Sequence, residues 1–102
     1  MQRPMTGNEE RKRTIWVADS HPQTVSIIDQ RFLPHELRVA RLRTVEEVCR
    51  AIKEMWVRGA PLIGATAAYG MYLACLEAEN SAFPLNLLNV YAAQLKKTRP
   101  TA

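Results

Sequence analysis

The chain has 102 residues, of which 47% are hydrophobic and 24% are charged, and its net charge is +4 at pH 7. This length suits one small domain with a single modest core, and the composition is that of an ordinary globular protein. Much of the positive charge lies near the two ends, where no aromatic residues alternate with the cations. We therefore expect solvated termini and no nucleic-acid partner.

The first segment is polar where a secretory signal would need an apolar core, so we expect a cytoplasmic chain whose residues 1–12 form a disordered tail. Residues 13–102 would form one domain. The apolar run over residues 60–76 contains glycine, threonine and tyrosine and is short, which argues against a membrane span. Cys49 and Cys75 lie in apolar helical patterns without the spacing of a metal or redox motif. They predict buried thiols and no metal site.

Short alternating segments predict a small antiparallel sheet near the start of the domain. Residues 14–17 read as one strand, residues 18–23 supply turn-forming residues, and residues 25–29 read as the returning strand. A third strand is expected within residues 36–42. Its alternation slips between Val39 and Leu42, so we expect it to contain a bulge.

Three helices are predicted to follow. Thr44 and Glu47 have the spacing of a capping box, and the apolar residues after them recur as on a helix of roughly thirteen residues. A second helix is expected from Pro61 to Glu79, apolar nearly all round and rich in small residues that let neighbouring helices approach closely. A third is expected after Pro84, with Leu88, Tyr91, Ala92 and Leu95 facing inward. The expected fold class is α+β, a sheet of about three strands followed by three α-helices.

The stretch Arg58-Gly59-Ala60, just before the second helix, is the strongest candidate for a binding site. The first amides of a helix lack intrahelical acceptors and lie at its positive end, and glycine lets the backbone approach an anion. Arginine adds a donor fork that matches a phosphate. A plain turn between two helices with an exposed arginine would have the same pattern, so spacing alone leaves both interpretations open.

Several stretches together resemble a known family. They are RTIWV at residues 13–17, IIDQRFLPHELR at 27–38, LRTVEEVCRAIKEMWVRGAPLIGATAAYGMYLA at 42–74 and TRPTA at 98–102. They look like the amino-terminal part of the S-methyl-5-thioribose-1-phosphate isomerase family, which belongs to the initiation factor 2B-like superfamily. The resemblance covers nearly all of the chain from Arg13 on.

The resemblance implies an aldose–ketose isomerase of methionine salvage that converts 5-methylthioribose 1-phosphate to 5-methylthioribulose 1-phosphate without a metal or organic cofactor. It implies substrate contacts at Arg58, Gly59, Ala60 and Arg99. The family's catalytic cysteine and aspartate lie in a Rossmann-like carboxyl-terminal domain with no counterpart here, so this chain is expected to be truncated, inactive alone and homodimeric only as part of a full-length enzyme. Two alternatives stay open: a non-catalytic regulatory module of the initiation-factor type, and an isomerase of another sugar phosphate, such as ribose 1,5-bisphosphate.

Overall fold

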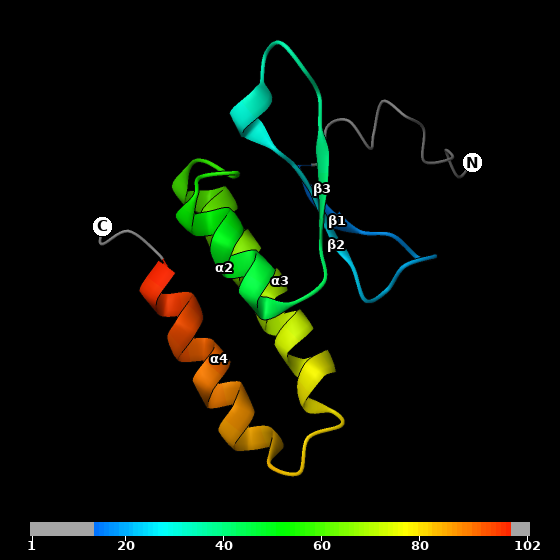
Figure 1. Cartoon of the computed structure of the whole chain (residues 1–102), viewed down its shortest axis with the longest axis vertical. Coiled ribbons are helices and arrows are strands. Elements are labelled where there is room, and N and C mark those ends of the chain that lie inside the picture. Colours follow the sequence, from blue (N-terminus) through cyan, green and yellow to red (C-terminus); the bar gives the residue numbers. More distant parts are fainter. Residues whose placement is uncertain (1–13, 99–102) are drawn as a thin grey trace, which may run out of the picture.

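The computed structural model describes residues 14–98, which form a three-stranded antiparallel sheet followed by three helices (Figure 1). The strands are β1 (Ile15–Val17), β2 (Val25–Ile28) and β3 (Val39–Leu42), in the order β1-β2-β3. The helices are α2 (Val45–Lys53), α3 (Ala60–Ala78) and α4 (Pro84–Thr98). The α+β class expected from the sequence is confirmed. The expected tail over residues 1–12 lies outside the described residues.

The strand register separates the sheet into two faces. Ile15 pairs with Ile27 and Ile27 with Ala40, while Val17 pairs with Val25 and Val25 with Leu42. These six residues line the face that packs on the helices, and Val25, Ile27 and Leu42 are almost fully buried there. Because side chains alternate along a strand, the opposite face carries the Trp16–Ser26–Arg41 row.

The third strand is shorter than predicted and contains no bulge. Four consecutive pairs join β2 to β3 without an extra residue, and residues 36–38 lie in a loop before the strand. The apparent slip between Val39 and Leu42 has another cause: Val39 is 41% exposed on the outer face, and the inward positions are Ala40 and Leu42, so the strand alternates regularly. Between β2 and β3 the chain forms a short 3-10 helix, η1 (Gln30–Phe32), which the sequence analysis did not predict, and a cis Leu33–Pro34 peptide bond.

Helix α2 begins as predicted and ends early. The amide of Glu47 donates to Thr44 Oγ1 at 3.1 Å, which is the expected cap, but Glu47 Oε1 accepts from the amide of Arg43, at 2.6 Å, and not from that of Thr44. The helix spans nine residues, fewer than the roughly thirteen expected. It stops because Met55 adopts a φ of 60°, and the Met55 and Trp56 amides turn back to carbonyls of the last helical turn.

Helix α3 is the central element of the helical layer and contacts α2, α4 and β1. Gly70 lies close to both neighbouring helices, because a Cβ there would lie 2.9 Å from Leu95 Cδ2 and 3.0 Å from Val48 Cγ1. Near its other end, Glu77 accepts from the Val45 amide at 3.0 Å and from the Tyr91 hydroxyl at 3.2 Å. The short clearances at Gly70 agree with the prediction that small residues on the second helix permit tight packing.

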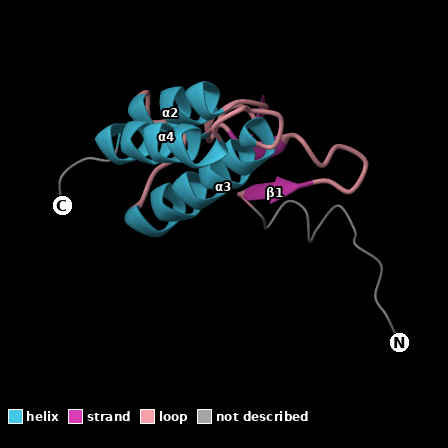
Figure 2. Cartoon of the chain, turned by 90° about the horizontal axis from the view of Figure 1, so that it is seen from below, coloured by secondary structure: helices cyan, strands magenta, loops and turns pink. Residues whose placement is uncertain are grey.

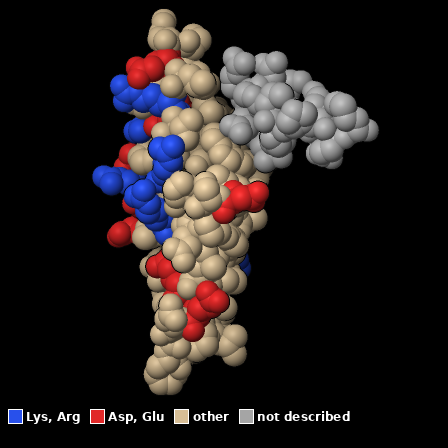
Figure 3. Space-filling view, turned by 90° about the vertical axis from the view of Figure 1, so that its right-hand side faces the viewer, with Lys and Arg blue, Asp and Glu red and all other residues tan. Residues whose placement is uncertain are grey.

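The helices gather on one side of the molecule and the strands on the other (Figure 2). Helix α4 runs back along α3, so its last turn points toward the end of the molecule at which α3 begins (Figure 1). Seen from the sheet side, lysine and arginine side chains gather along one edge, and much of the remaining described surface is uncharged (Figure 3). Within residues 14–98 no helix is both long enough and apolar enough to cross a membrane.

Candidate functional site at the start of helix α3

The structure places Arg58, Gly59 and Ala60 together in the exposed turn between α2 and α3. Gly59 is the N-cap residue of α3, with a φ of 89° and a ψ of 135°, and no side chain caps the helix there. An L-residue adopts such a φ only with strain, so this turn requires glycine. Helix α3 begins at Ala60, one residue earlier than predicted, and Pro61 lies in its first turn.

Most backbone amides in the first turn of α3 have no acceptor within the helix. The Ile63 amide donates to the Gly59 carbonyl at 2.9 Å, which is the first bond of the helix. The amides of Ala60 and Leu62 precede that bond, and Pro61 has no amide hydrogen. The positive end of the helix dipole therefore coincides with an exposed glycine and the exposed Arg58. This arrangement suits an anionic group of the size of a phosphate.

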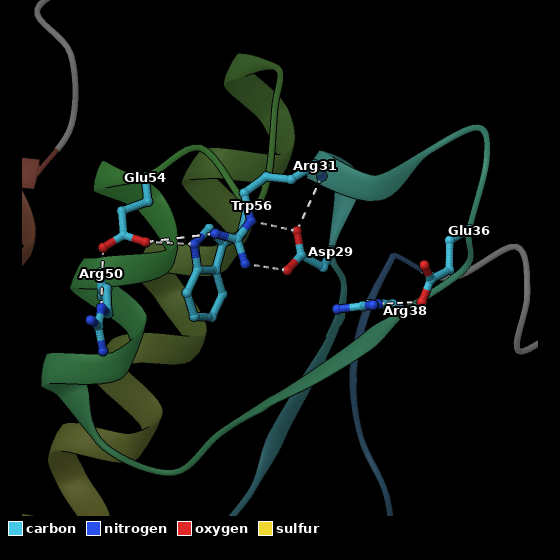
Figure 4. Close-up of polar contacts among 7 residues, drawn as sticks. All are labelled: Asp29, Arg31, Glu36, Arg38, Arg50, Glu54 and Trp56. Atoms are coloured by element: carbon cyan, nitrogen blue, oxygen red, sulfur yellow. Dashed lines mark hydrogen bonds and ion pairs between the residues drawn. The ribbon is translucent and has the colours of Figure 1, made fainter.

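A network of charged and aromatic side chains includes Trp56, which lies in the segment that leads into this turn (Figure 4). Arg31 donates from Nε to Asp29 Oδ1 at 2.9 Å and from Nη2 to Asp29 Oδ2 at 2.7 Å. Its guanidinium lies over the Trp56 ring, 4.4 Å from the centroid. Trp56 Nε1 donates to Glu54 Oε1 at 3.1 Å, and Arg50 Nε donates to Glu54 Oε2 at 3.1 Å. The network therefore joins η1 to the end of α2 and to the segment that leads into α3.

The sequence analysis missed this network because its members are far apart in the chain. Asp29 caps η1 by accepting the Arg31 amide at 3.1 Å. Its side chain is nevertheless only 5% exposed. The available signal was the pair of carboxylate and arginine in Asp29-Gln30-Arg31, directly after a buried strand.

Hydrogen bonds within the network shift the pKa values of its two carboxylates, Asp29 and Glu54. Hydrogen bonds from the Arg31 side chain hold the pKa of Asp29 below its ordinary value, although burial of the carboxylate acts in the opposite direction. Hydrogen bonds from Trp56 and then from Arg50 lower the pKa of Glu54. Both carboxylates are therefore ionised at neutral pH and serve as acceptors for the arginines.

The remaining reactive side chains are not assembled into a catalytic group. Cys49 is half-buried, and burial raises the pKa of its thiol. Cys75 is exposed, so the expectation that both thiols are buried is wrong for Cys75, which lies on the uncovered side of α3. His21 and His35 are exposed. Among residues 14–98 no three histidine, cysteine, aspartate or glutamate side chains lie close enough together to hold a metal ion.

A groove of about 560 Å³ lies between α2 and α4, apart from the Arg58 turn itself. Its lining mixes cations with acids and includes Cys49, Arg50, Lys53, Glu46, Glu77 and Lys97. Glu77 is already engaged by the Val45 amide and the Tyr91 hydroxyl. The mixed charges do not select one sign of ligand, so the turn before α3 is the better candidate for anion binding.

Arg99, the fourth residue expected to contact substrate, lies outside the described residues. The described part of α4 ends at Thr98, in the helical turn that points toward the start of α3.

Two curated relatives of this chain carry the same name. The chain is 45% identical over 98 residues to the methylthioribose-1-phosphate isomerase of Desulfatibacillum aliphaticivorans, matching 96% of this chain and 27% of the relative. It is 54% identical over 90 residues to that of Paramagnetospirillum magneticum, matching 88% of this chain and 24% of the relative. The chain thus spans about a quarter of the length of these relatives. No protein-family model matches it.

Two solved structures share the fold. The 5-methylthioribose 1-phosphate isomerase from Pyrococcus horikoshii OT3 is 41% identical with a TM-score of 0.75, over 87% of this chain and 25% of that one. The translation initiation factor eIF-2B, subunit delta, from A. fulgidus is 41% identical with a TM-score of 0.76, over 87% of this chain and 26% of that one. The resemblance expected from the sequence is confirmed: the matched residues are similar to about a quarter of the methylthioribose-1-phosphate isomerase of Desulfatibacillum aliphaticivorans and share the fold of the matching part of the Pyrococcus horikoshii isomerase.

Proposed function

We propose that this chain is the substrate-binding part of a methylthioribose-1-phosphate isomerase, and that the turn Arg58-Gly59-Ala60 binds the phosphate of the sugar. The observation that carries the proposal is the uncapped start of α3, where Gly59 takes a φ of 89° beside an exposed Arg58. The names of the relatives support the sugar phosphate as the ligand.

The chemistry of the turn fits a phosphate monoester. Two amides and the positive end of the α3 dipole favour an anion, at about 0.3–2 kcal/mol for the dipole alone. The Arg58 guanidinium can donate two parallel hydrogen bonds to phosphate oxygens, a pairing that a lysine cannot reproduce. Arg99 is proposed as a second guanidinium for the same substrate.

Catalysis is assigned to residues beyond this chain. The resemblance implies a cysteine and an aspartate in a second domain, and the chain spans only about a quarter of its relatives. The complete protein would carry out an aldose–ketose isomerisation without a metal or organic cofactor, as a cytoplasmic homodimer. The described residues would contribute binding of the phosphate and part of the active-site wall.

A regulatory role is the second candidate, since the initiation-factor subunit from A. fulgidus shares the fold with a TM-score of 0.76. A regulatory module has no need of a phosphate site formed by Arg58 and the start of α3. An isomerase of another sugar phosphate would keep the phosphate site and differ in its recognition of the rest of the sugar.

The first experiment is an NMR titration of the 102-residue chain with inorganic phosphate and, separately, with methylthioribose 1-phosphate. Saturable shifts are expected at the amides of Gly59, Ala60 and Leu62, and they should be lost in Arg58→Ala. Arg41→Ala removes the same charge from an exposed position on β3 and is the matched control, expected to bind as the wild type does. Shifts spread over all exposed cations would overturn the assignment of the site.

The second experiment tests the reaction with a chimera in which this chain replaces the matching part of the Pyrococcus horikoshii isomerase. We expect turnover of methylthioribose 1-phosphate, and a strong rise in KM when Arg58 is changed to alanine. A folded chimera that binds the substrate without converting it would refute the isomerase assignment and favour the regulatory one. Conversion of ribose 1,5-bisphosphate in place of methylthioribose 1-phosphate would support the third alternative.

A further inference from the structure

The Arg31 side chain connects three parts of the molecule that the chain sequence keeps apart (Figure 4). It binds both oxygens of Asp29 at the start of η1, and its Nη1 lies 3.7 Å from Oε1 of Glu54, which follows α2. Its guanidinium also lies over the ring of Trp56 in the turn. The Arg31 side chain is 37% exposed, and the Asp29 side chain that it binds is 5% exposed.

Trp56 is fixed by its backbone as well as by its ring. Its carbonyl accepts from the Gln30 amide at 2.8 Å, and its amide donates to the Ala51 carbonyl at 2.8 Å. Val57, the next residue, is fully buried, and Arg58 follows it at the surface. The turn therefore has a rigid base at Trp56 and Val57, immediately before the exposed residues of the candidate site.

We propose that Arg31 is a positioning residue for the phosphate-binding turn, acting through Trp56 to hold the backbone of residues 57–59 in the geometry that aligns Arg58 with the start of α3. This inference rests on the proposed function. A planar guanidinium can stack on an indole and bind a carboxylate through two hydrogen bonds at once, whereas an ammonium cannot. Arg31 thus links Asp29, which directly follows the central strand β2, to Trp56 in the segment before α3.

The conservative variant Arg31→Lys tests this proposal because it keeps the charge and loses both the stacking and the paired hydrogen bonds. We expect the backbone of residues 57–59 to become more mobile on the nanosecond timescale in the heteronuclear NMR relaxation of the chain. We also expect phosphate to bind about threefold to tenfold more weakly, the equivalent of the lost stacking interaction. A spectrum that keeps its dispersion shows that the variant is folded.

Arg38→Lys is the matched control. The Arg38 guanidinium stacks on Phe32, 4.1 Å from the ring centroid, and pairs with Glu36, but it does not contact the turn. We expect this variant to leave both the mobility of residues 57–59 and the affinity for phosphate unchanged. An equal effect of Arg31→Lys and Arg38→Lys would overturn the proposal, because general loosening of the η1 loop would then explain both.

Two further outcomes separate this proposal from the proposed function. If the wild-type chain binds phosphate and Arg31→Lys binds it equally well, the positioning role is wrong and the phosphate site stands. If the wild-type chain does not bind phosphate, the site is wrong, and the mobility of residues 57–59 still decides whether Arg31 holds the turn.

A variant at Trp56, on which Arg31 stacks, keeps the proposal testable even if Arg31→Lys does not fold. Trp56→Leu removes the stacking surface and keeps an apolar side chain at a half-buried position. We expect Trp56→Leu to loosen residues 57–59 to the same extent, and the double variant to add little to either single change. Additive effects of the two substitutions on the mobility of the turn would contradict transmission through Trp56.

Discussion

Replacing Gly70 by alanine should reveal how tightly α3 is held between α2 and α4. A Cβ at this position would lie 2.9 Å from Leu95 Cδ2, 3.0 Å from Val48 Cγ1 and 3.2 Å from Leu95 Cδ1. Leu95 is only 3% exposed, so its methyl groups have no solvent to move into. The new methyl group must therefore displace the packed side chains of both neighbouring helices.

Two opposing effects determine how Gly70→Ala changes the free energy of unfolding. Alanine is favoured over glycine inside a helix by about 1 kcal/mol. Overpacking a core of this kind costs about 1–3 kcal/mol. We therefore expect Gly70→Ala to lower the free energy of unfolding by about 0–2 kcal/mol, in contrast to the gain of about 1 kcal/mol that the same change gives at an unconstrained helical site.

A double-mutant cycle separates the two terms. Leu95→Ala alone should cost about 2–5 kcal/mol through the cavity it leaves. In that background most of the clash is gone, so Gly70→Ala should become stabilising, and the two changes should be coupled by about 1–3 kcal/mol. Urea denaturation followed by circular dichroism measures all four free energies of unfolding. Ala68→Gly, at an exposed position of the same helix, measures the propensity term by itself.

The reasoning would be refuted if Gly70→Ala stabilised the wild-type chain by as much as Ala68→Gly destabilises it. Such a result would mean that the propensity term acts alone and that α3 does not approach α2 and α4 closely at Gly70. An uncoupled cycle with Leu95→Ala would lead to the same conclusion.

Two further predictions concern titration and thiol reactivity. Asp29→Asn should lower the free energy of unfolding at pH 7 by about 1–3 kcal/mol, because a nearly buried acceptor of charged hydrogen bonds is lost. The folded-state pKa of Asp29 is lowered, so its stabilising contribution is complete about one pH unit above the ordinary Asp pKa of about 3.9 and is lost as the pH falls through the lowered folded-state pKa. The difference between variant and wild type should therefore shrink as the pH drops from about 5 toward about 3, and a constant difference would contradict the Arg31 pairing. A thiol reagent should modify Cys75 before Cys49, because Cys75 is exposed and burial raises the pKa of the Cys49 thiol. Mass spectrometry of the digested chain identifies the modified cysteine. Labelling of Cys49 before Cys75 would contradict this order.

Local patterns predicted the helices well because their signals lie within a few residues of one another. The capping pair Thr44 and Glu47 located the start of α2, and proline and small residues located α3 to within one residue. The end of α2 was missed because Met55 and Trp56 continue the apolar period of the helix. The structure ends α2 there through a left-handed residue, and a non-glycine residue gives no sequence signal of that conformation.

The candidate site was predicted only in part. Arg58, Gly59 and Ala60 are adjacent in the chain, so their pattern was visible, and the structure brings them to an uncapped helix start. The contacts of Arg31 with Glu54 and Trp56 join residues more than twenty positions apart. Such contacts depend on the path of the chain through β3 and α2, which no local pattern encodes.

The position of the turn before α3 is determined from two directions. The body of α3 is fixed by close packing at Gly70 and by Glu77, which joins it to the start of α2 and to Tyr91 of α4. Its first turn is fixed by Trp56, held through the Gln30 amide and the Arg31 guanidinium. With both supports beneath it, the turn keeps residues 58–60 exposed.

The same frame occurs in two solved structures with different names, an isomerase and an initiation-factor subunit, at the same 41% identity. A fold that occurs in both proteins does not by itself determine which function this chain has. Selection must then come from the side chains exposed on the frame and from the part of the protein that faces them. Arg58 is such a side chain: it is exposed and charged, and it lies beside a glycine that α3 needs for its start. Loss of phosphate binding in Arg58→Ala without loss of stability would separate the ligand site from the frame that supports it.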